Sequence, residues 1–293
     1  MARQPRSLVG RTVAITGGAR GIGAATAVAL DRQGARVAIG DLDVDLAAEV
    51  AGQLRQPALG LELDVTDRQA FTAFLDRVES ELGPIDVLIN NAGIMPIGPI
   101  TEETDQTTSH QLAINLHAVI HGSKEAVRRM TRRGAGHIVN IASAAGKTPV
   151  PSAATYSATK FGVVGFSESL RLELAGSGID ISCVMPGIVR TELASGLRDT
   201  AGFKPVQPED VAAAIVDALQ RPRFDVFVPR SIGPTSRLSA LMPRRFGDWL
   251  VRTIGVDRLM AEAAGARERA AYEQRIAGSA PAADRETDGS RGA

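Results

Sequence analysis

The sequence predicts an α/β protein built on one doubly wound parallel sheet of about seven strands, with helices on both faces. Short apolar runs alternate with longer amphipathic stretches, which is the pattern of repeated strand–helix units. Several runs are apolar throughout rather than alternating, as expected for strands buried on both faces of a parallel sheet. The seven runs are TVAIT (12–16), RVAIG (36–40), ALGLEL (58–63), IDVLIN (85–90), HIVNIAS (137–143), IDISCVM (179–185) and FDVFV (224–228).

The stretches between these runs have helical spacing. In segment 43–54, Leu46, Val50 and Leu54 recur on one face of a helix. Segment 67–82 shows the same spacing over a larger apolar set. Its members are Phe71, Phe74, Leu75, Val78 and Leu82. These segments therefore predict amphipathic helices that cover the sheet.

We expect three regions along the chain. No change in composition divides residues 1–230, which are expected to form a single domain. Residues 231–277 lose the alternation and indicate a helical C-terminal extension, punctuated by Pro234 and Pro243. Residues 278–293 are rich in Gly, Ala, Ser and charged residues, so we expect a disordered tail.

Composition and charge argue against several classes of function. Lysine plus arginine equals aspartate plus glutamate at 33 each, so the net charge gives no reason to expect nucleic acid as a partner. No apolar run reaches the roughly 18 residues of a membrane-spanning helix, and no apolar segment of a signal peptide precedes the first strand. The single cysteine, Cys183, lies in an apolar run and suits a reducing compartment, so we expect a cytoplasmic protein.

The segment TGGARGIG (16–23) separates the first apolar run from an alanine-rich helical stretch. A loop between a strand and a helix presents helix N–H groups to a pyrophosphate, and glycines let the backbone approach closely. Thr26 stands where the common dinucleotide fingerprint has a third glycine after Gly21 and Gly23, so a simple tight turn is an alternative. Asp41 ends the next run about 20 residues later, where a carboxylate can accept hydrogen bonds from ribose hydroxyls, and it favours dinucleotide binding.

Further motifs follow the glycine segment in a fixed order along the chain. They are LDVT (63–66), NNAG (90–93), Asn115 in INLH, Ser143 in NIAS, YSATK (156–160) and PGIVRT (186–191). Together with the glycine segment, which fits the signature T-G-x-x-x-G-x-G, this ordered set resembles the short-chain dehydrogenases/reductases over about residues 8–230. The resemblance implies a Rossmann-type fold, a nicotinamide dinucleotide cofactor and oxidoreductase activity.

Tyr156 and Lys160 stand four residues apart in a segment with helical spacing, so their side chains share one face. A tyrosine that acts as a base near neutral pH needs a lowered pKa, and we expect the Lys160 ammonium and an oxidised nicotinamide to lower it. The resemblance implies that Tyr156 is the general acid/base, that Lys160 also holds the nicotinamide ribose, and that Ser143 steadies the substrate oxygen. It further implies that Asn115 kinks its helix and holds a water that connects Lys160 with solvent.

The resemblance also implies which residues contact the cofactor. These residues are Gly17, Arg20, Gly21, Ile22, Gly23, Asp41, Asp64, Val65, Asn91, Ala92, Gly93, Tyr156, Lys160, Pro186, Gly187, Ile188 and Thr191. The expected positions are Asp64 and Val65 at the adenine, Asn91 and Gly93 at the adenine-side ribose, and Ile188 and Thr191 at the nicotinamide carboxamide.

The choice between NAD and NADP depends on two residues with opposite effects. Asp41 would repel the additional phosphate of NADP, whereas the guanidinium of Arg20 could pair with it. No basic residue follows Asp41 directly to neutralise its carboxylate, because Leu42 and Asp43 come next. We therefore expect NAD, with NADP as the alternative.

Two groups of residues on predicted helices each allow two interpretations. His117 and His121 have the spacing of two helical metal ligands, but no third ligand is visible, so ordinary helix histidines are favoured and no metal is expected. Gly162, Val163 and Phe166 would suit the homodimer or homotetramer interface that the resemblance implies, and core packing explains them equally well.

Segment 237–258 carries five arginines and two aspartates among apolar residues. Such a segment could rest on a membrane surface. Its prolines and aspartates weaken an amphipathic face, so a lid over the substrate cleft or a contact with a neighbouring subunit is favoured.

The sequence thus predicts an NAD(P)-dependent oxidoreductase that transfers hydride between nicotinamide and a secondary alcohol or ketone. An apolar pocket favours a lipophilic substrate such as a steroid, retinoid or acyl derivative. The residues expected to line it are Ile94, Met95, Ala145, Val150 and Gly187. One alternative is an NADPH-dependent reductase of 3-oxoacyl groups on a carrier or coenzyme A. Another is a dinucleotide sensor without turnover, against which intact Ser143, Tyr156 and Lys160 argue.

Overall fold

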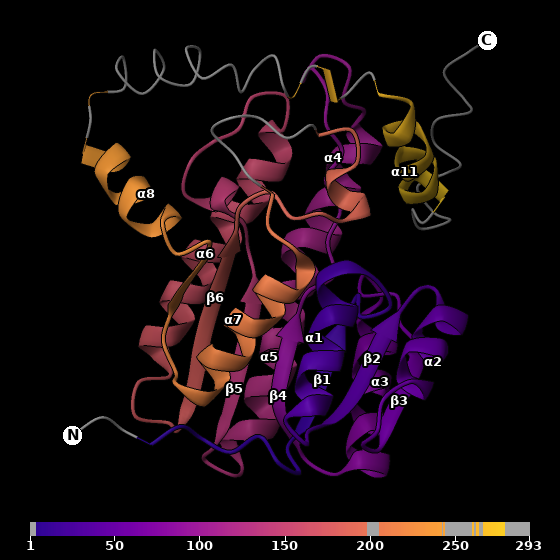
Figure 1. Ribbon diagram of the computed structural model, residues 1–293, viewed down its shortest axis with the longest axis vertical. Helices are drawn as coiled ribbons and strands as arrows, with labels where there is room; N and C mark the ends of the chain where they lie inside the picture. Colours follow the sequence, from indigo (N-terminus) through magenta and orange to yellow (C-terminus); the bar gives the residue numbers. More distant parts are fainter. Residues whose placement is uncertain are drawn as a thin grey trace.

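The computed structural model describes residues 4–197, 205–241, 243, 260, 262–263 and 266–278 of the 293-residue chain (Figure 1). Seven parallel strands form one sheet in the order β3-β2-β1-β4-β5-β6-β7. The strands are β1 (Thr12–Thr16), β2 (Arg36–Asp41), β3 (Ala58–Glu62), β4 (Ile85–Asn90), β5 (Gly136–Ile141), β6 (Ile179–Pro186) and β7 (Asp225–Val228). Each coincides with one of the seven predicted runs to within two residues at either end, so the doubly wound parallel sheet is confirmed.

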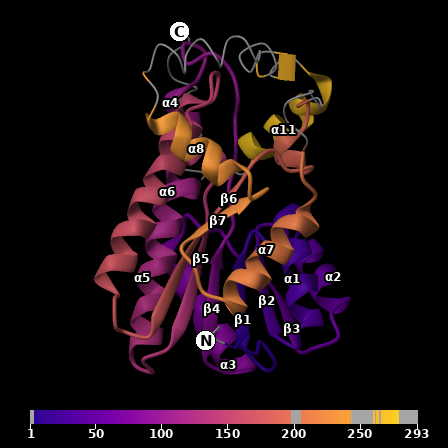
Figure 2. The same ribbon diagram turned by 60° about the vertical axis from the view of Figure 1, so that its left-hand side comes forward.

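Helices cover both faces of the sheet (Figures 1 and 2). The main helices are α1 (Gly21–Arg32), α2 (Val44–Gly52), α3 (Arg68–Leu82), α4 (Asp105–Leu112), α5 (Ala118–Thr131), α6 (Ala154–Glu173), α7 (Pro208–Gln220), α8 (Ile232–Leu241) and α11 (Arg267–Gly278). Successive strand residues point to opposite faces. Val13 and Ile15 of β1 therefore pack in the cluster with α1, α2 and α7, whereas Ala14 packs on the other side with α3 and α5.

The parallel arrangement places the carboxyl ends of all strands at one edge of the sheet. The glycine loop after β1 and the segments after β4, β5 and β6 are therefore neighbours, although they are far apart in sequence. Both α8 and α11 lie beyond this same edge (Figures 1 and 2). The fold thus brings all the predicted site segments to one end of the molecule.

The expected division into 1–230, 231–277 and 278–293 stays a prediction. Helix α8 falls in the second region, and α11 falls there except for its last residue, Gly278. Helix α11 also contacts the first region, because the Tyr272 hydroxyl accepts a hydrogen bond of 2.9 Å from the backbone N–H of Met95. The tail beyond residue 278 and most of segment 237–258, considered for membrane contact, lie outside the described residues. Of the helices that the structure describes, none has the length and apolar character needed to cross a bilayer.

Candidate active site

The glycine loop leaves no room for a side chain at Gly17 or Gly23. Gly17 and Gly21 have φ angles of +62° and +52°, which L-residues with side chains rarely adopt. A Cβ on Gly23 would lie 2.3 Å from the carbonyl oxygen of Gly17, well inside van der Waals contact. Because α1 begins at Gly21, the loop leads directly to a helix N-terminus, which attracts a phosphate group.

The end of β4 holds this loop in place. Asn91 Nδ2 donates to the carbonyl oxygens of Thr16 (3.0 Å) and Gly17 (2.7 Å). In return, the Thr16 hydroxyl accepts hydrogen bonds from the backbone N–H groups of Asn91 (3.0 Å) and Ala92 (3.1 Å). Asn91 therefore shapes the loop through its side chain, whatever further contact it makes with a cofactor.

Arg20, a residue of the loop, and Asp41, at the end of β2, have different partners. The Asp41 carboxylate accepts hydrogen bonds from the backbone N–H groups of Ala19 (3.0 Å) and Asp43 (3.1 Å). The guanidinium of Arg20 pairs with Asp43 at 2.5 Å and with Glu192 at 3.8 Å. The backbone N–H of Leu46 and the Arg20 guanidinium lower the pKa of Asp43, so this carboxylate is ionised beside Arg20. The charge of Arg20 is thus matched within the protein.

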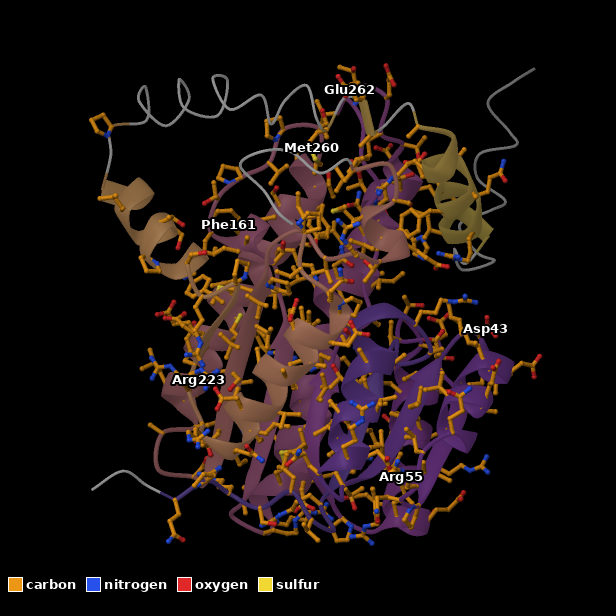
Figure 3. All side chains as sticks on the ribbon, viewed as in Figure 1. Asp43, Arg55, Phe161, Arg223, Met260 and Glu262 are labelled. Atoms are coloured by element: carbon orange, nitrogen blue, oxygen red, sulfur yellow. The ribbon has the colours of Figure 1, made fainter. Side chains whose placement is uncertain are left out.

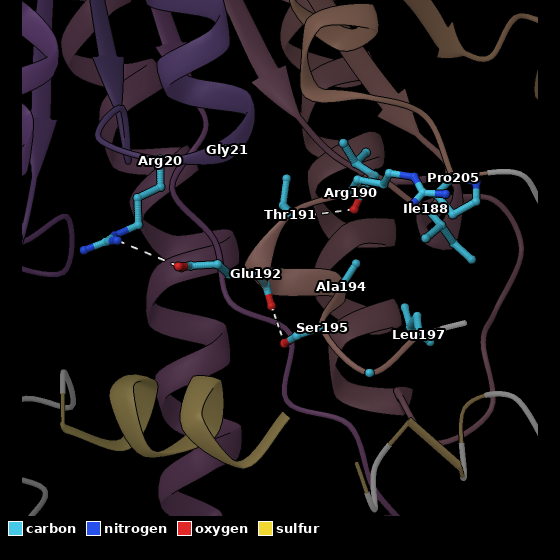
Figure 4. A pocket seen from close by; sticks show the side chains of 12 residues that line it. Arg20, Gly21, Ile188, Arg190, Thr191, Glu192, Ala194, Ser195, Leu197 and Pro205 are labelled. Carbon is cyan, nitrogen blue, oxygen red and sulfur yellow. Dashed lines mark hydrogen bonds and ion pairs between the residues drawn. The ribbon is translucent and has the colours of Figure 1, made fainter. Parts of the chain in front are cut away.

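A cavity of about 500 Å³ opens between the glycine loop and the segment after β6 (Figure 4). It is lined by Arg20 and Gly21 on one side and by residues 188–192 and 194–197, with Pro205, on the other. Thr191 comes close to the loop, since a Cβ on Gly21 would lie 3.0 Å from its methyl group. The expected cofactor residues Ile188 and Thr191 therefore face the glycine loop across this cavity.

Three side chains predicted to carry the chemistry meet at the carboxyl edge. Tyr156 and Lys160 project from α6, and the hydroxyl of Ser143, which follows β5, is close enough to Tyr156 to lower the pKa of its phenol. Lys160 Nζ lies 5.6 Å from the centroid of the Tyr156 ring and donates to the Ile141 carbonyl at 3.0 Å. The Tyr156 phenol, the Ser143 hydroxyl and the Lys160 ammonium are thus grouped at the carboxyl edge of the sheet.

Asn115 lies in a π-helical turn, Ala113–His117, between α4 and α5, so the helix is distorted where the resemblance implies a kink. Its side-chain amide binds both backbone groups of Ile94, accepting from N–H and donating to C=O at 2.8 Å each. A Cβ on Gly93 would lie 3.3 Å from Asn115 Oδ1 and 3.6 Å from Lys160 Nζ. Gly93 therefore lies beside Asn115 and Lys160, and its expected contact with the adenine-side ribose stays a prediction. A water held by Asn115 stays a prediction.

Burial is the largest effect on the pKa values of both Tyr156 and Lys160. Tyr156 is 7% exposed, and burial raises its pKa to about 12, because the Ser143 hydroxyl and the charge of Arg269 offset only part of the effect. Burial also lowers the pKa of Lys160 to about 8. Among the groups of the protein, burial outweighs the effects that lower the pKa of Tyr156, and the expectation that Lys160 together with an oxidised nicotinamide lowers this pKa stays a prediction. The ammonium donates to the Ile141 carbonyl rather than to the phenol, so desolvation is the larger effect.

An apolar cluster encloses Tyr156 on the substrate side. Its members come from the segments after β4, β5 and β6 and from the C-terminal extension, and Figure 3 shows Met260 above the carboxyl edge. The cluster consists of Met95, Ile97, Ala145, Ala153, Tyr156, Met260 and Ala263, with Val150, Leu193 and Leu197 packed against it. Three expected pocket residues, Met95, Ala145 and Val150, are thus brought around Tyr156.

Other expected site residues have different surroundings. Ile94 packs in the core beneath the sheet, and Gly187 lies against Ile232 and Val228 instead of Tyr156. Asp64 accepts hydrogen bonds from both the backbone N–H (2.8 Å) and the hydroxyl (2.7 Å) of Thr66.

Three more expected cofactor residues have structural roles. Val65 is buried among the core residues and Ile22 packs against the core, while Pro186 ends β6. Contacts of these residues with a cofactor stay predictions.

Sequence reasoning missed the contribution of α11. Arg269 is fully buried and donates to the Leu193 carbonyl at 2.7 Å and to the Met95 carbonyl, while Tyr272 binds the Met95 N–H. No local pattern marks these residues, because the sequence RERAAYEQR (267–275) resembles any charged surface helix. The long-range packing alone reveals them.

The residues of the cleft fit a nicotinamide dinucleotide. A loop that excludes Cβ atoms, a helix N-terminus and a carboxylate at the end of β2 supply what a pyrophosphate and a ribose need. Within the described ranges, no group of three or more His, Cys, Asp or Glu side chains could hold a metal ion.

Comparisons with known proteins give the same picture. The sequence model of the family described as short chain dehydrogenase matches residues 11–202. The chain is 38% identical over 191 residues to the 3-oxoacyl-acyl-carrier-protein reductase FabG of Haemophilus influenzae, covering 65% of this chain and 78% of that protein. It is 35% identical over 213 residues to the 3-alpha-(or 20-beta)-hydroxysteroid dehydrogenase of Mycobacterium bovis, covering 71% and 82%.

The fold has a solved counterpart. A crystal structure of a short chain dehydrogenase/reductase from Burkholderia phymatum in complex with NAD matches with a TM-score of 0.74 and 26% identity, covering 80% of this chain and 94% of that one. The first curated relatives are longer proteins, and the chain spans 40% of their length.

Proposed function

The chain belongs to the short-chain dehydrogenase family, and on that premise we propose that it is an NAD(P)-dependent oxidoreductase acting on a secondary alcohol or ketone. The observation that carries the proposal is the meeting of Tyr156, Ser143 and Lys160 at the carboxyl edge of the sheet. The apolar cluster that includes Met95 and Met260 surrounds Tyr156, and the glycine loop lies across the cavity from the segment after β6.

The proposed chemistry divides between cofactor and protein. A bound nicotinamide supplies or accepts the hydride at the substrate carbon. Tyr156 exchanges a proton with the substrate oxygen, and the Ser143 hydroxyl holds that same oxygen. With a pKa raised to about 12, Tyr156 is protonated at neutral pH, which is the form that donates to a carbonyl oxygen. In the oxidation direction it must lose its proton, and the neighbouring Lys160 ammonium stabilises the phenolate.

NAD is the proposed cofactor. Asp41 lies next to the glycine loop, where its charge opposes the additional phosphate of NADP. Arg20, the residue that could attract that phosphate, is already paired with Asp43 and Glu192. The NAD complex of the Burkholderia relative supports this choice.

A lipophilic alcohol or ketone is the proposed substrate. The surroundings of Tyr156 are apolar, with Met95, Met260 and Leu193 among its neighbours in the cluster. The likeness to a hydroxysteroid dehydrogenase supports a substrate of this kind.

The likeness to FabG favours one second candidate, an NADPH-dependent reductase of 3-oxoacyl thioesters. Rates with acetoacetyl-CoA and each reduced cofactor separate the two. Faster turnover of the thioester with NADPH than of any ketone with NADH would favour the second candidate.

We also propose an oligomeric state and a cellular location for the protein. We propose a homodimer or homotetramer, as is usual in this family. Val163 is buried in the core of one chain, so core packing explains it, while Phe161 on the same helix is 43% exposed and available for a contact (Figure 3). A cytoplasmic location fits the one cysteine, Cys183, which is free and buried.

The deciding experiment is a spectrophotometric screen of isopropanol, cyclohexanol, androsterone and the matching ketones with both cofactors, on the wild type and Tyr156→Phe. We expect turnover by the wild type and a loss of at least about a hundredfold in the variant, as for removal of a general acid/base. NAD affinity and thermal stability serve as controls and should change little. Binding of NAD without turnover of any substrate would favour the sensor and refute the proposal.

A further inference from the structure

Arg269 on α11 is the largest fully buried side chain among the residues that the structure describes. It lies outside the region matched by the family model, residues 11–202. An arginine is rarely buried unless its guanidinium is bound on several sides, because desolvation of the charge is unfavourable. The partners of Arg269 therefore indicate what its burial achieves.

The guanidinium joins three segments that are far apart in sequence. Nη1 donates to the carbonyl oxygens of Leu193 (2.7 Å) and Ser195 (3.5 Å), in the segment after β6. Nη2 donates to the carbonyl of Met95, in the segment after β4, and Nε donates to Glu273 on α11 at 3.3 Å. One side chain thus connects the segments after β4 and β6 with α11.

Tyr272 strengthens the same junction. Its hydroxyl accepts a hydrogen bond from the N–H of Met95 at 2.9 Å, so α11 binds both backbone groups of that residue. The Tyr272 ring lies 4.7 Å from the guanidinium carbon of Arg269 and 5.6 Å from that of Arg275. Met95 in turn packs in the cluster with Tyr156.

The charge of Arg269 also acts on the reaction centre. The titratable and polar groups that face Tyr156 are Lys160 on the same helix, Ser143 after β5, and Arg269 with Tyr272 on α11. Among them, the Ser143 hydroxyl and the Arg269 cation lower the pKa of Tyr156, against the larger effect of burial. Arg269 therefore influences Tyr156 both through the cleft wall and through its field.

We propose that Arg269 is a positioning residue and a determinant of substrate specificity: it fixes the segments after β4 and β6 against α11, so that an apolar wall closes over a lipophilic substrate at Tyr156. The proposal rests on the proposed function. Because the guanidinium donates to main-chain carbonyls and to Glu273, it organises the wall and does not serve as a ligand for a substrate carboxylate.

The test uses the full chain with NAD present and compares Arg269→Met, Arg269→Lys and Arg275→Met. Arg275 is the matched control, an exposed arginine on the same helix that pairs with Glu192 at 2.6 Å. Hydrogen exchange is measured in peptides covering 93–98, 190–197 and 267–276. We expect Arg269→Met to speed exchange in all three together by at least about tenfold, as for loss of a hydrogen bond to a charged group, and Arg275→Met to leave 93–98 unchanged.

Kinetics supply the second readout. For Arg269→Met we expect the KM for androsterone to rise by about tenfold, the KM for isopropanol to rise less, and the KM for NAD to stay within about twofold. The pH at which alcohol oxidation is half-maximal should move upward, and Arg269→Lys should restore part of each effect. If Arg269→Met fails to fold, Tyr272→Phe replaces it, and faster exchange in 93–98 is then expected.

Two results would overturn the proposal. One is an exchange pattern in Arg269→Met equal to that of Arg275→Met. The other is a lower melting temperature with unchanged KM values and pH profile. Failure of the proposed function looks different, because the wild type would then bind NAD without turnover while the exchange comparison still decides whether Arg269 organises the wall.

Discussion

The two sides of the cleft are held by different parts of the molecule. On the cofactor side, Asn91 and Thr16 connect the ends of neighbouring strands, and their bonds lie inside the region that the family model matches. On the substrate side, Arg269 and Tyr272 reach Met95 from 174 and 177 residues further along the chain. The sheet therefore supports the proposed cofactor site directly, whereas the proposed substrate site depends on α11, a helix that follows the sheet in sequence.

This difference has a physical reason. A dinucleotide needs backbone N–H groups and space, which glycines at a strand–helix turn provide. A substrate needs side chains that match its own shape, and these can come from any segment that reaches the carboxyl edge. The cofactor side is expected to tolerate little change, and the substrate side to set selectivity.

The largest effect is expected at Lys160, where the two sides meet. Lys160→Met should lower turnover by at least about a hundredfold, because the phenolate loses its neighbouring cation. Burial lowers the pKa of Lys160 from 10.5 to about 8, so between these values the unfolded chain binds more protons and wild-type stability rises with pH. Below pH 8 the wild type carries the full cost of a buried ammonium.

We therefore expect Lys160→Met to be more stable than the wild type below pH 8, by about 1–3 kcal/mol, and this gain to shrink as the pH approaches 10.5. Urea denaturation at several pH values measures it. A variant that is less stable than the wild type at every pH would contradict the assignment of a desolvated cation.

On the cofactor side, Gly23→Ala should weaken NAD binding by about tenfold to a hundredfold. This range corresponds to the roughly 1–3 kcal/mol that an additional group in a tightly packed site costs. The new Cβ would meet the Gly17 carbonyl at 2.3 Å and the Gly18 Cα at 2.7 Å. Gly52→Ala is the matched control, since no atom lies within 4 Å of its Cβ position. Titration of both variants with NAD, followed by calorimetry, should show an unchanged affinity for the control only.

Asp41→Asn should shift the preference between NAD and NADP by about tenfold toward NADP, since one charge repulsion near the surface is removed. Arg20→Gln should change the preference by less than about twofold, because Arg20 is paired with Asp43 and Glu192 in the native protein. The kcat/KM values for the two cofactors give both ratios. A larger shift for Arg20→Gln than for Asp41→Asn would reverse the proposed order of the two residues.

The smallest effect is expected at the exposed end of α11. Arg275→Met removes an ion pair with Glu192 in which both side chains are about half exposed, at 47% and 51%. Such pairs contribute less than about 1 kcal/mol, so the melting temperature should hardly move. A loss comparable to that of Arg269→Met would mean that surface charge, rather than the buried guanidinium, holds α11 in place.

Much of the fold could be predicted because its signals are local. The apolar runs at 12–16 and 36–40 became β1 and β2 with boundaries shifted by at most one residue. The glycine spacing of TGGARGIG likewise predicted a loop with close backbone approach, and the structure leaves no room for a Cβ at Gly23. Both signals are contained in a few neighbouring residues. An apolar run indicates a strand buried on both faces, and closely spaced glycines indicate a backbone that leaves no room for side chains.

The remaining properties depend on contacts between distant segments. No pattern near Tyr156 shows that its pKa is raised to about 12, because the desolvation comes from its surroundings in the folded chain, which include Met260 and Ala263 of the extension. Arg269 is likewise indistinguishable from a surface arginine until folding brings it to the carbonyl of Met95. Periodicity and glycine spacing are local properties of the sequence, so the strands and the glycine loop could be predicted from the order of residues. Burial and long-range hydrogen bonds arise only when segments meet in space, and they determine the protonation of Tyr156 and the position of Met95 in the proposed substrate site.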